Sequence, residues 1–304
     1  PHAPPPPLAV FFFIQPSAFI ARASTTGRAT WFPGGLLRAF AGAYKPRALF
    51  RRHFTRFPAK ATPLDVEISA VVPVKDEAGN VVPLLREIAD ALKGEKAEII
   101  FIDDASGDAT AAELLAARAE IPILRVLQHT RNAGQSAAVR TGVTAARGRL
   151  VVTLDGDGQN NPADVPKLIA AYRASGPGAN IRMVAGQRVG RKDTAIKKIT
   201  SRFANRLRRW ALDDATRDTG CGLKLFEREA FLRLPYFDHI HRYLPALMKR
   251  EGYGVALVDV SHRPRGEGRS KYGTLDRALV GIRDLMGVMW LMQRRRMTGE
   301  VKEL

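Results

Sequence analysis

The chain has 304 residues, of which 45% are hydrophobic, and its 48 Lys and Arg against 30 Asp and Glu give a formal net charge of +18. This length and apolar content provide for a sizeable core and exclude an intrinsically disordered protein. The single cysteine, Cys221, excludes an internal disulfide framework and a cysteine-based zinc site, and it fits a reducing compartment.

Half of the net charge lies in residues 1–64, which contain nine basic residues and no acidic one. Their apolar run 8–14 is far shorter than the roughly 20 residues of a membrane span. The Arg-rich, acid-free composition is shared with organellar transit peptides, and the short apolar run with signal sequences. We interpret residues 1–64 as a disordered or non-native extension, with contact to a membrane surface as the alternative.

From Glu67 onward, short apolar runs alternate with segments of helical periodicity. The pattern predicts strands at 68–74, 99–102, 123–127, 150–154 and 182–185, and helices at 81–92, 109–119, 133–146 and 163–172. Strands separated by helices of this length predict right-handed crossovers and a mostly parallel central sheet with helices on both faces. In such an α/β fold, ligands bind at the carboxyl ends of the strands.

The most informative motif is Asp155-Gly156-Asp157, which follows the predicted strand 150–154. Charged residues at the exit of a buried strand lie where the sheet meets solvent and ligand. Mg²⁺ and Mn²⁺ prefer carboxylate and phosphate oxygens, and a glycine turn lets both carboxylates approach one ion. The motif therefore predicts a divalent metal site that also binds phosphate groups. An acidic turn that only ends the strand is the alternative.

The first two predicted strands also end in acidic residues. After the first strand, Glu77 could accept a hydrogen bond from a nucleobase or ribose, whereas Asp76 and Glu77 could equally favour the start of the next helix. After the second strand, either Asp103 or Asp104 is expected to face the base or ribose. The neighbouring Ser106 or Asp108 is expected to cap the next helix.

The third predicted strand leads through Arg131 and Gly134 into a helix rich in small residues. Small side chains allow close packing against the sheet. A glycine at a helix entry could expose backbone amides to a phosphate. Taken together, the strand ends predict a nucleotide site beside the metal site.

These motifs, in this order, resemble the family-2 inverting glycosyltransferases with the GT-A fold, and most of all their dolichyl- or polyprenyl-phosphate sugar synthases. The resemblance spans 66–273 and rests on Pro73-Val74-Lys75-Asp76-Glu77, Asp103-Asp104-Ala105-Ser106, Arg131-Asn132-Ala133-Gly134 and Asp155-Gly156-Asp157-Gly158-Gln159. It implies a GT-A catalytic domain over 65–273.

The resemblance also implies roles for single residues. The first motifs, including Pro73 and Val74, would hold the nucleotide, with Asp104 at the uridine or guanosine end and Asp155 at the diphosphate. The side chains of Asp155, Asp157 and Gln159 would surround Mg²⁺ or Mn²⁺. The sequence departs from the family at Lys75, often Tyr or Phe, and at Gly156 and 160–162, where Ala and a Gln-His-Pro run are frequent. These departures leave the nucleobase open.

A basic segment follows at 262–273. Its cations Arg263, Arg265, Arg269 and Lys271 exceed what Glu267 neutralises, so the segment should bind an external anion. In the family, the pattern that runs here from Arg265 through Ser270 to Lys271 closes over the active site and contacts phosphate. Arg188 likewise resembles a phosphate-contacting arginine. A solvated basic loop is the alternative.

The charges also indicate a mechanism. A lipid phosphate acceptor is already anionic near neutral pH, so its transfer reaction needs cations more than a general base. Asp218 lies where the family can place a base or an acid that orients the acceptor, but it could equally satisfy loop amides around Gly220 and Gly222. His241 and Arg242 should begin a helix on the acceptor side, with His241 structural. Cys221 is expected to be a packed side chain.

Residues 274–304 are expected to form an amphipathic carboxyl-terminal helix and tail. The apolar stretch 279–292 is interrupted by Arg283 and Asp284 and followed by three arginines, so it is too short and too charged to span a bilayer. It fits a helix at an anionic membrane surface, and equally one docked on its own domain or on another subunit. Homo-oligomerisation is left open.

The sequence therefore predicts a peripheral enzyme on the cytoplasmic face of a membrane, which moves a sugar from a UDP- or GDP-sugar to a polyprenyl phosphate. Mannose, glucose, galacturonate and amino-arabinose derivatives all remain candidates. The alternatives are a transferase that acts on a saccharide hydroxyl and a nucleotidyltransferase that makes sugar nucleotides. Nucleic-acid binding is not expected, because basic strands interleaved with aromatic residues are missing.

Overall fold

The computed structural model describes residues 65–189, 212, 216–263 and 274–295. The predicted extension 1–64 lies outside the described residues, and so do Arg265, Arg269, Ser270 and Lys271 of the basic segment.

A seven-stranded sheet forms the centre of the described fold, in the order β3-β2-β1-β4-β6-β5-β7. Strand β6 runs antiparallel to both neighbours, β4 and β5, whereas the other pairs are parallel. The strands are β1 (Ile68–Val74), β2 (Ala97–Asp103), β3 (Leu124–Gln128), β4 (Leu150–Thr153), β5 (Ile181–Arg188), β6 (Lys224–Glu227) and β7 (Gly254–Val260). The predicted mostly parallel α/β sheet is confirmed, with β6 and β7 as strands that the apolar pattern did not indicate.

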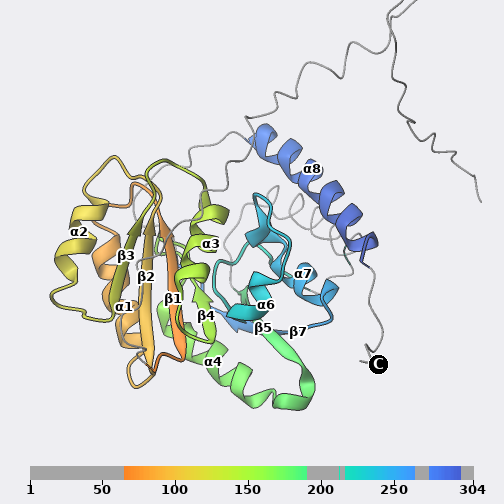
Figure 1. The fold of residues 1–304 in the computed structure, drawn as a ribbon, viewed down its shortest axis with the longest axis horizontal. Coiled ribbons are helices and arrows are strands. Elements are labelled where there is room, and N and C mark those ends of the chain that lie inside the picture. The colour runs from red at the N-terminus through yellow and green to blue at the C-terminus, as the bar shows by residue number, and fades with distance from the viewer. Residues whose placement is uncertain (1–64, 190–211, 213–215, 264–273, 296–304) are drawn as a thin grey trace, which may run out of the picture. The chain divides into compact units, whose positions relative to one another are not determined.

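Helices cover both faces of this sheet (Figure 1), with α2 towards the β3 end and α7 and α8 towards the β7 end. The α-helices are α1 (Val81–Ala91), α2 (Thr110–Ala117), α3 (Gln135–Ala145), α4 (Val165–Ala174), α6 (Arg228–Leu232), α7 (Leu244–Arg250) and α8 (Thr274–Gln293). Short 3₁₀ turns lie at η1 (Pro162–Asp164), η2 (Pro177–Ala179) and η3 (Ile240–Arg242).

Two hydrophobic cores result, because successive side chains of a strand point to opposite faces. In β1 and β2, Val72 and Phe101 face the core with α1, α2 and α4, whereas Val71 and Ile102 face the core with α3, α6 and α7. Both strands are buried along nearly their whole length, which explains why they are continuous apolar runs.

Helix α3 packs very close to the sheet. A Cβ atom at Gly142 would lie 2.5 Å from Val71 Cγ1 and 2.6 Å from Ile102 Cδ1. The small residues of this helix therefore bring its amino end to the carboxyl ends of the central strands, where the acidic motifs lie.

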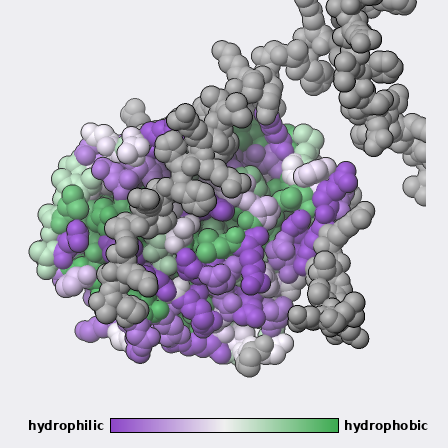
Figure 2. Space-filling model, in the orientation of Figure 1, coloured by the Kyte–Doolittle hydropathy of each residue, from purple (hydrophilic) through white to green (hydrophobic). Residues whose placement is uncertain are grey.

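Helix α8 docks on its own domain through one face. Val288 is buried in the second core, and Leu291 O accepts a hydrogen bond from Arg250 Nε at 3.0 Å. Its other face exposes Ile282, Met286 and Trp290. Among the described helices, none has the length and apolar character needed to cross a bilayer. In the view of Figure 2, hydrophilic residues predominate and hydrophobic residues surface in patches between them.

Candidate active site

Asp155 lies directly beyond the end of β4, at the edge of the sheet where the parallel strands end. Its Oδ1 accepts a hydrogen bond from Gln135 Nε2 at 2.8 Å, at the start of α3, and its backbone N donates to Asn160 Oδ1 at 2.8 Å. Gly156 follows over the end of β1, where a Cβ atom would lie 2.5 Å from Val74 Cγ1. The close passage over β1 therefore requires glycine between the two acids.

The second acid, Asp157, accepts the backbone N–H of Gln159 at 3.1 Å. Burial raises the pKa of Asp155, and the Asp157 carboxylate raises it further, while Lys224 and Arg188 oppose the shift. A divalent cation stabilises two neighbouring carboxylates of which one is removed from water, because it offsets both their repulsion and the cost of burial.

The donor set fits a hard divalent ion. Asp155, Asp157 and Gln159 offer carboxylate and amide oxygens, the ligand type that Mg²⁺ and Mn²⁺ prefer. Within the described ranges, no group of three or more His, Cys, Asp or Glu side chains forms a closed metal cage.

Arg188 and Asp218 form a bidentate ion pair beside this site. Arg188 Nε donates to Asp218 Oδ2 at 2.5 Å and Nη2 donates to Oδ1 at 3.0 Å. Asp218 Oδ1 also accepts the backbone N–H of Gly220 at 3.0 Å. Asp218 thus satisfies a loop amide, as one of the two sequence interpretations expected, and it orients Arg188.

The loop that carries Asp218 returns along β4. Gly222 lies opposite Asp155, and a Cβ atom at Gly222 would overlap the Asp155 carboxylate. The glycine therefore leaves the space that the carboxylate occupies.

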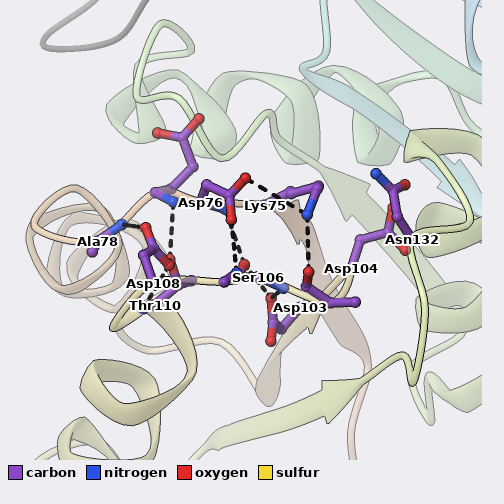
Figure 3. Close-up of polar contacts among 12 residues, drawn as sticks. Lys75, Asp76, Ala78, Asp103, Asp104, Ser106, Asp108, Thr110 and Asn132 are labelled. Atoms are coloured by element: carbon purple, nitrogen blue, oxygen red, sulfur yellow. Dashed lines mark hydrogen bonds and ion pairs between the residues drawn. The ribbon is translucent and has the colours of Figure 1, made fainter.

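The loops after β1 and β2 are tied to one another (Figure 3). Asp76 Oδ1 accepts Gly107 N at 2.8 Å, Ser106 Oγ accepts Asp76 N at 2.9 Å, and Asp103 Oδ1 accepts Ser106 N at 3.0 Å. Asp76 has a φ of 53°, in the left-handed region that non-glycine residues rarely adopt. Asp108, and not Ser106, accepts the first amide of α2, Thr110 N, at 3.0 Å.

Glu77 lies on the same loop, where its backbone N donates to Thr110 Oγ1 at 2.9 Å and its Oε2 accepts Asn80 Nδ2 at 3.0 Å. Pro73 and Val74 are the last residues of β1, and Val74 is paired with Asp103 of β2. The predicted nucleotide residues of the first two motifs are therefore gathered at one edge.

Asp104 binds the loop between β3 and α3. Its carboxylate accepts hydrogen bonds from the backbone N–H groups of Ala133 at 2.9 Å and Gly134 at 2.8 Å. His129 Nδ1 lies 2.7 Å from Asp104 Oδ1, and only 4% of Asp104 is exposed. The Gly134 amide is therefore used inside the protein. Nucleotide binding by Asp104, Gly134 and the exposed Arg131 stays a prediction.

Of the four cations predicted in the basic segment, Arg263 is the one within the described residues. Its Nη1 donates to Glu87 Oε2 at 2.6 Å, and its backbone N donates to Gln159 O at 3.2 Å. The end of β7 is thereby tied to the turn that carries the acidic pair.

Comparison with known proteins identifies the family. The family model "Glycosyl transferase family 2" matches residues 69–234. The chain belongs to glycosyl transferase family 2.

Two curated relatives of this family-2 glycosyltransferase act on polyprenyl phosphates, according to their names. Dodecaprenyl-phosphate galacturonate synthase of Rhizobium johnstonii is 33% identical over 77% of this chain and 70% of its own length. Undecaprenyl-phosphate 4-deoxy-4-formamido-L-arabinose transferase of Pectobacterium carotovorum is 32% identical over 68% of this chain. The chain spans 63% of that second relative.

Solved structures share the fold. Glucosyl-3-phosphoglycerate synthase of Mycobacterium tuberculosis, in complex with phosphoglyceric acid, has a TM-score of 0.56 at 19% identity, over 75% of this chain and 80% of that one. The same enzyme crystallised with Mn²⁺, UDP-glucose and phosphoglyceric acid gives a TM-score of 0.55 at 20% identity, over 75% of this chain and 79% of that one. The GT-A fold expected from the motifs is confirmed.

Three polar residues of this glycosyltransferase site were missed by sequence reasoning. Gln135 binds Asp155, Gln187 Oε1 accepts the amides of Arg217 and Asp218 at 2.8 Å and 3.0 Å, and Lys224 is buried at the start of β6. Burial lowers the pKa of Lys224. The only sequence signal was a lysine directly before the apolar residues of β6.

His241 lies on the α3 side of the site, where its Nδ1 is 2.8 Å from Ser136 Oγ. Burial lowers the pKa of His241 to about 3, and Lys224, Arg242 and His239 add to the shift. His241 and Arg242 lie in the 3₁₀ turn η3, and α7 begins at Leu244, so the two residues precede this helix and do not begin it as expected. Cys221 is buried, as expected of a packed side chain.

Proposed function

We propose that this glycosyltransferase moves a sugar from a nucleoside-diphosphate donor to a polyprenyl phosphate, with inversion at the sugar, in a reaction that depends on Mg²⁺ or Mn²⁺. The observation that carries the proposal is the Asp155 and Asp157 pair beyond β4, with Asp155 held by Gln135 and backed by Gly222. The names of relatives at 33% and 32% identity support the acceptor class.

On the donor side, Asp155, Asp157 and Gln159 would hold the metal ion. Mg²⁺ or Mn²⁺, when bound by these residues, would supply positive charge that stabilises a diphosphate leaving group. The nucleoside would lie over the ends of β1 and β2 and the loop after β3, against Pro73, Val74, Asp76, Glu77, Asp103, Asp104, Arg131 and Gly134. UDP and GDP both remain candidates for the nucleotide.

On the acceptor side, the nucleophile would be a phosphate oxygen. A phosphate monoester is anionic near neutral pH, so a residue that removes a proton is not required. We assign a phosphate contact to Arg188, whose guanidinium is held in a fixed orientation by two hydrogen bonds to Asp218. Arg263, Arg265, Ser270 and Lys271 complete the proposed acceptor-phosphate set.

Helix α8 would bring the enzyme to the lipid. Its exposed Met286 and Trp290 lie beside Arg283 and Arg294, and Arg294 lies over the Trp290 ring at 5.7 Å. An apolar helix face flanked by cations fits the surface of an anionic membrane. We propose that the enzyme is a peripheral protein on the cytoplasmic face of a membrane.

The test is transfer of label into lipid. Purified protein is incubated with labelled UDP- and GDP-sugars, a polyprenyl phosphate and Mg²⁺ or Mn²⁺, and the label extracted into organic solvent is measured with and without EDTA. We expect metal-dependent label in the lipid. Label only in water-soluble glycan would instead indicate a saccharide hydroxyl acceptor, and formation of nucleoside triphosphate from pyrophosphate would indicate a nucleotidyltransferase.

A substitution of Asp157 tests the metal assignment. Asp157→Ala should abolish metal-dependent transfer while the melting temperature stays near that of the wild type. Asp90→Ala, which removes an exposed acid from α1, is the matched control and should keep full activity. Unchanged transfer by Asp157→Ala would rule out Asp157 as a metal ligand.

A further inference from the structure

Lys224 is buried at the start of β6, at the end of the sheet where the parallel strands finish and the candidate site lies. Only 4% of the residue is exposed, and its strand, β6, lies between β4 and β5. Its Nζ donates to the backbone carbonyl of Cys221 and, at 3.4 Å, to that of Thr219. A buried amine is costly unless its hydrogens are bonded, so these two carbonyls are the reason it is tolerated there.

The register places Lys224 beside Asp155. Thr153 of β4 pairs with Lys224 of β6, and the two chains run antiparallel. Since side chains alternate between faces, Asp155 lies on the same face as Thr153, and Gly222 on the same face as Lys224. Lys224 and Asp155 are therefore diagonal neighbours on the α3 side of the sheet.

Side chains from three strands hold the loop 217–223 through hydrogen bonds. From β5, Gln187 Oε1 accepts the amides of Arg217 and Asp218. From β4, Thr153 Oγ1 donates to Gly222 O at 2.8 Å. From β6, Lys224 holds the carbonyls in the middle of the loop.

The loop 217–223 makes two contacts with residues of the proposed active site. Asp218 orients Arg188, and Gly222 lies against the Asp155 carboxylate. A shift of the loop by a fraction of an ångström would change both contacts, because neither has room to spare.

We propose that Lys224 is a positioning residue of the transferase site: its buried Nζ fixes the turn 219–221, and thereby sets Gly222 behind Asp155 and Asp218 against Arg188. The inference rests on the proposed function for its chemical meaning. Lys224 acts through the loop and touches neither the donor nor the acceptor. The Nζ donates to both carbonyls as an ammonium or as an amine, so the role does not depend on its charge.

The test uses two variants, Lys224→Met and Thr153→Val. The second removes the hydrogen bond from Thr153 to Gly222 O in the same loop without changing the charge. Mn²⁺-dependent binding of UDP and GDP is measured by titration calorimetry, and transfer by steady-state kinetics. Lys224→Met should weaken metal-dependent nucleotide binding by about tenfold and Thr153→Val by roughly threefold, as expected for the loss of buried hydrogen bonds. The double variant should lose less than the product of the two effects, because both act on one loop.

Lys93→Met is the charge control, since Lys93 is an exposed lysine just beyond α1. It should bind and transfer like the wild type. Normal nucleotide binding and turnover by Lys224→Met, with only a lowered melting temperature, would show a purely structural role and overturn the inference. If Lys224→Met fails to fold, Thr153→Val decides: wild-type binding in that variant overturns the inference, and weakened binding at an unchanged melting temperature supports it.

The binding measurement separates this inference from the proposed function. A wild-type protein that transfers sugar to no polyprenyl phosphate would refute the proposed acceptor. The effect of Lys224→Met on metal-dependent nucleotide binding would still decide the role of Lys224.

Discussion

His241 should make the protein unusually sensitive to mild acid. The pKa of this histidine is lowered from 6.5 to about 3, chiefly by burial, with Lys224, Arg242 and His239 adding to the shift. Below pH 6.5 the unfolded chain binds a proton at this position, whereas the folded protein does not until about pH 3. Stability is therefore complete above pH 6.5 and is lost as the pH falls towards 3.

The size of the loss follows from the same shift. Each pH unit below the unfolded pKa costs about 1.4 kcal/mol for one proton that only the unfolded state binds. Between pH 7.5 and pH 5, His241 alone should remove about 2 kcal/mol from the free energy of unfolding.

The assay compares the wild type with His241→Asn, whose side-chain amide replaces the ring nitrogen that faces Ser136. Urea unfolding at pH 7.5 and pH 5 gives the free energy of unfolding for both proteins. The wild type should lose about 2 kcal/mol more than the variant, since all other titrating groups are shared and cancel. Equal losses, or an NMR titration of His241 near pH 6.5, would refute the reasoning.

Three further outcomes are expected. Gly222→Ala, which places a Cβ atom on the Asp155 carboxylate, should abolish metal-dependent nucleotide binding while the circular dichroism spectrum stays native. Gly142→Ala should lower the free energy of unfolding by about 1–3 kcal/mol, measured in urea, because α3 has no space for a methyl group there. Trp290→Glu should weaken binding to anionic vesicles about tenfold, whereas Leu115→Glu, a change of an equally exposed side chain on α2, should leave it unchanged.

The repeating part of the fold could be predicted because each element carries a local signal. Strand β1 has the predicted bounds, 68–74, since a strand buried on both faces is a continuous apolar run. Strands β6 and β7 were missed for physical reasons. Strand β6 has only four residues and depends on β4 and β5 as neighbours, and β7 is an edge strand with exposed positions.

The candidate site divides in the same way. The acids after β4 were predictable, because charge at the exit of an apolar strand is visible in the sequence itself. Gln187 and Lys224 were not, because their partners lie in a loop whose path depends on three strands far apart in sequence. Asp218 shows the limit most clearly, since only the structure reveals that Arg188 takes both of its oxygens.

The reversed direction of β6 has an evolutionary consequence. The neighbouring strands β4 and β5 end at the side of the sheet that carries the candidate site, whereas β6 begins there. Inserting or deleting one residue in the entering segment would turn Lys224 to the opposite side, since a strand has a period of two. Among homologues, insertions and deletions should therefore occur in the loops that follow the parallel strands and be rare in the residues directly before β6.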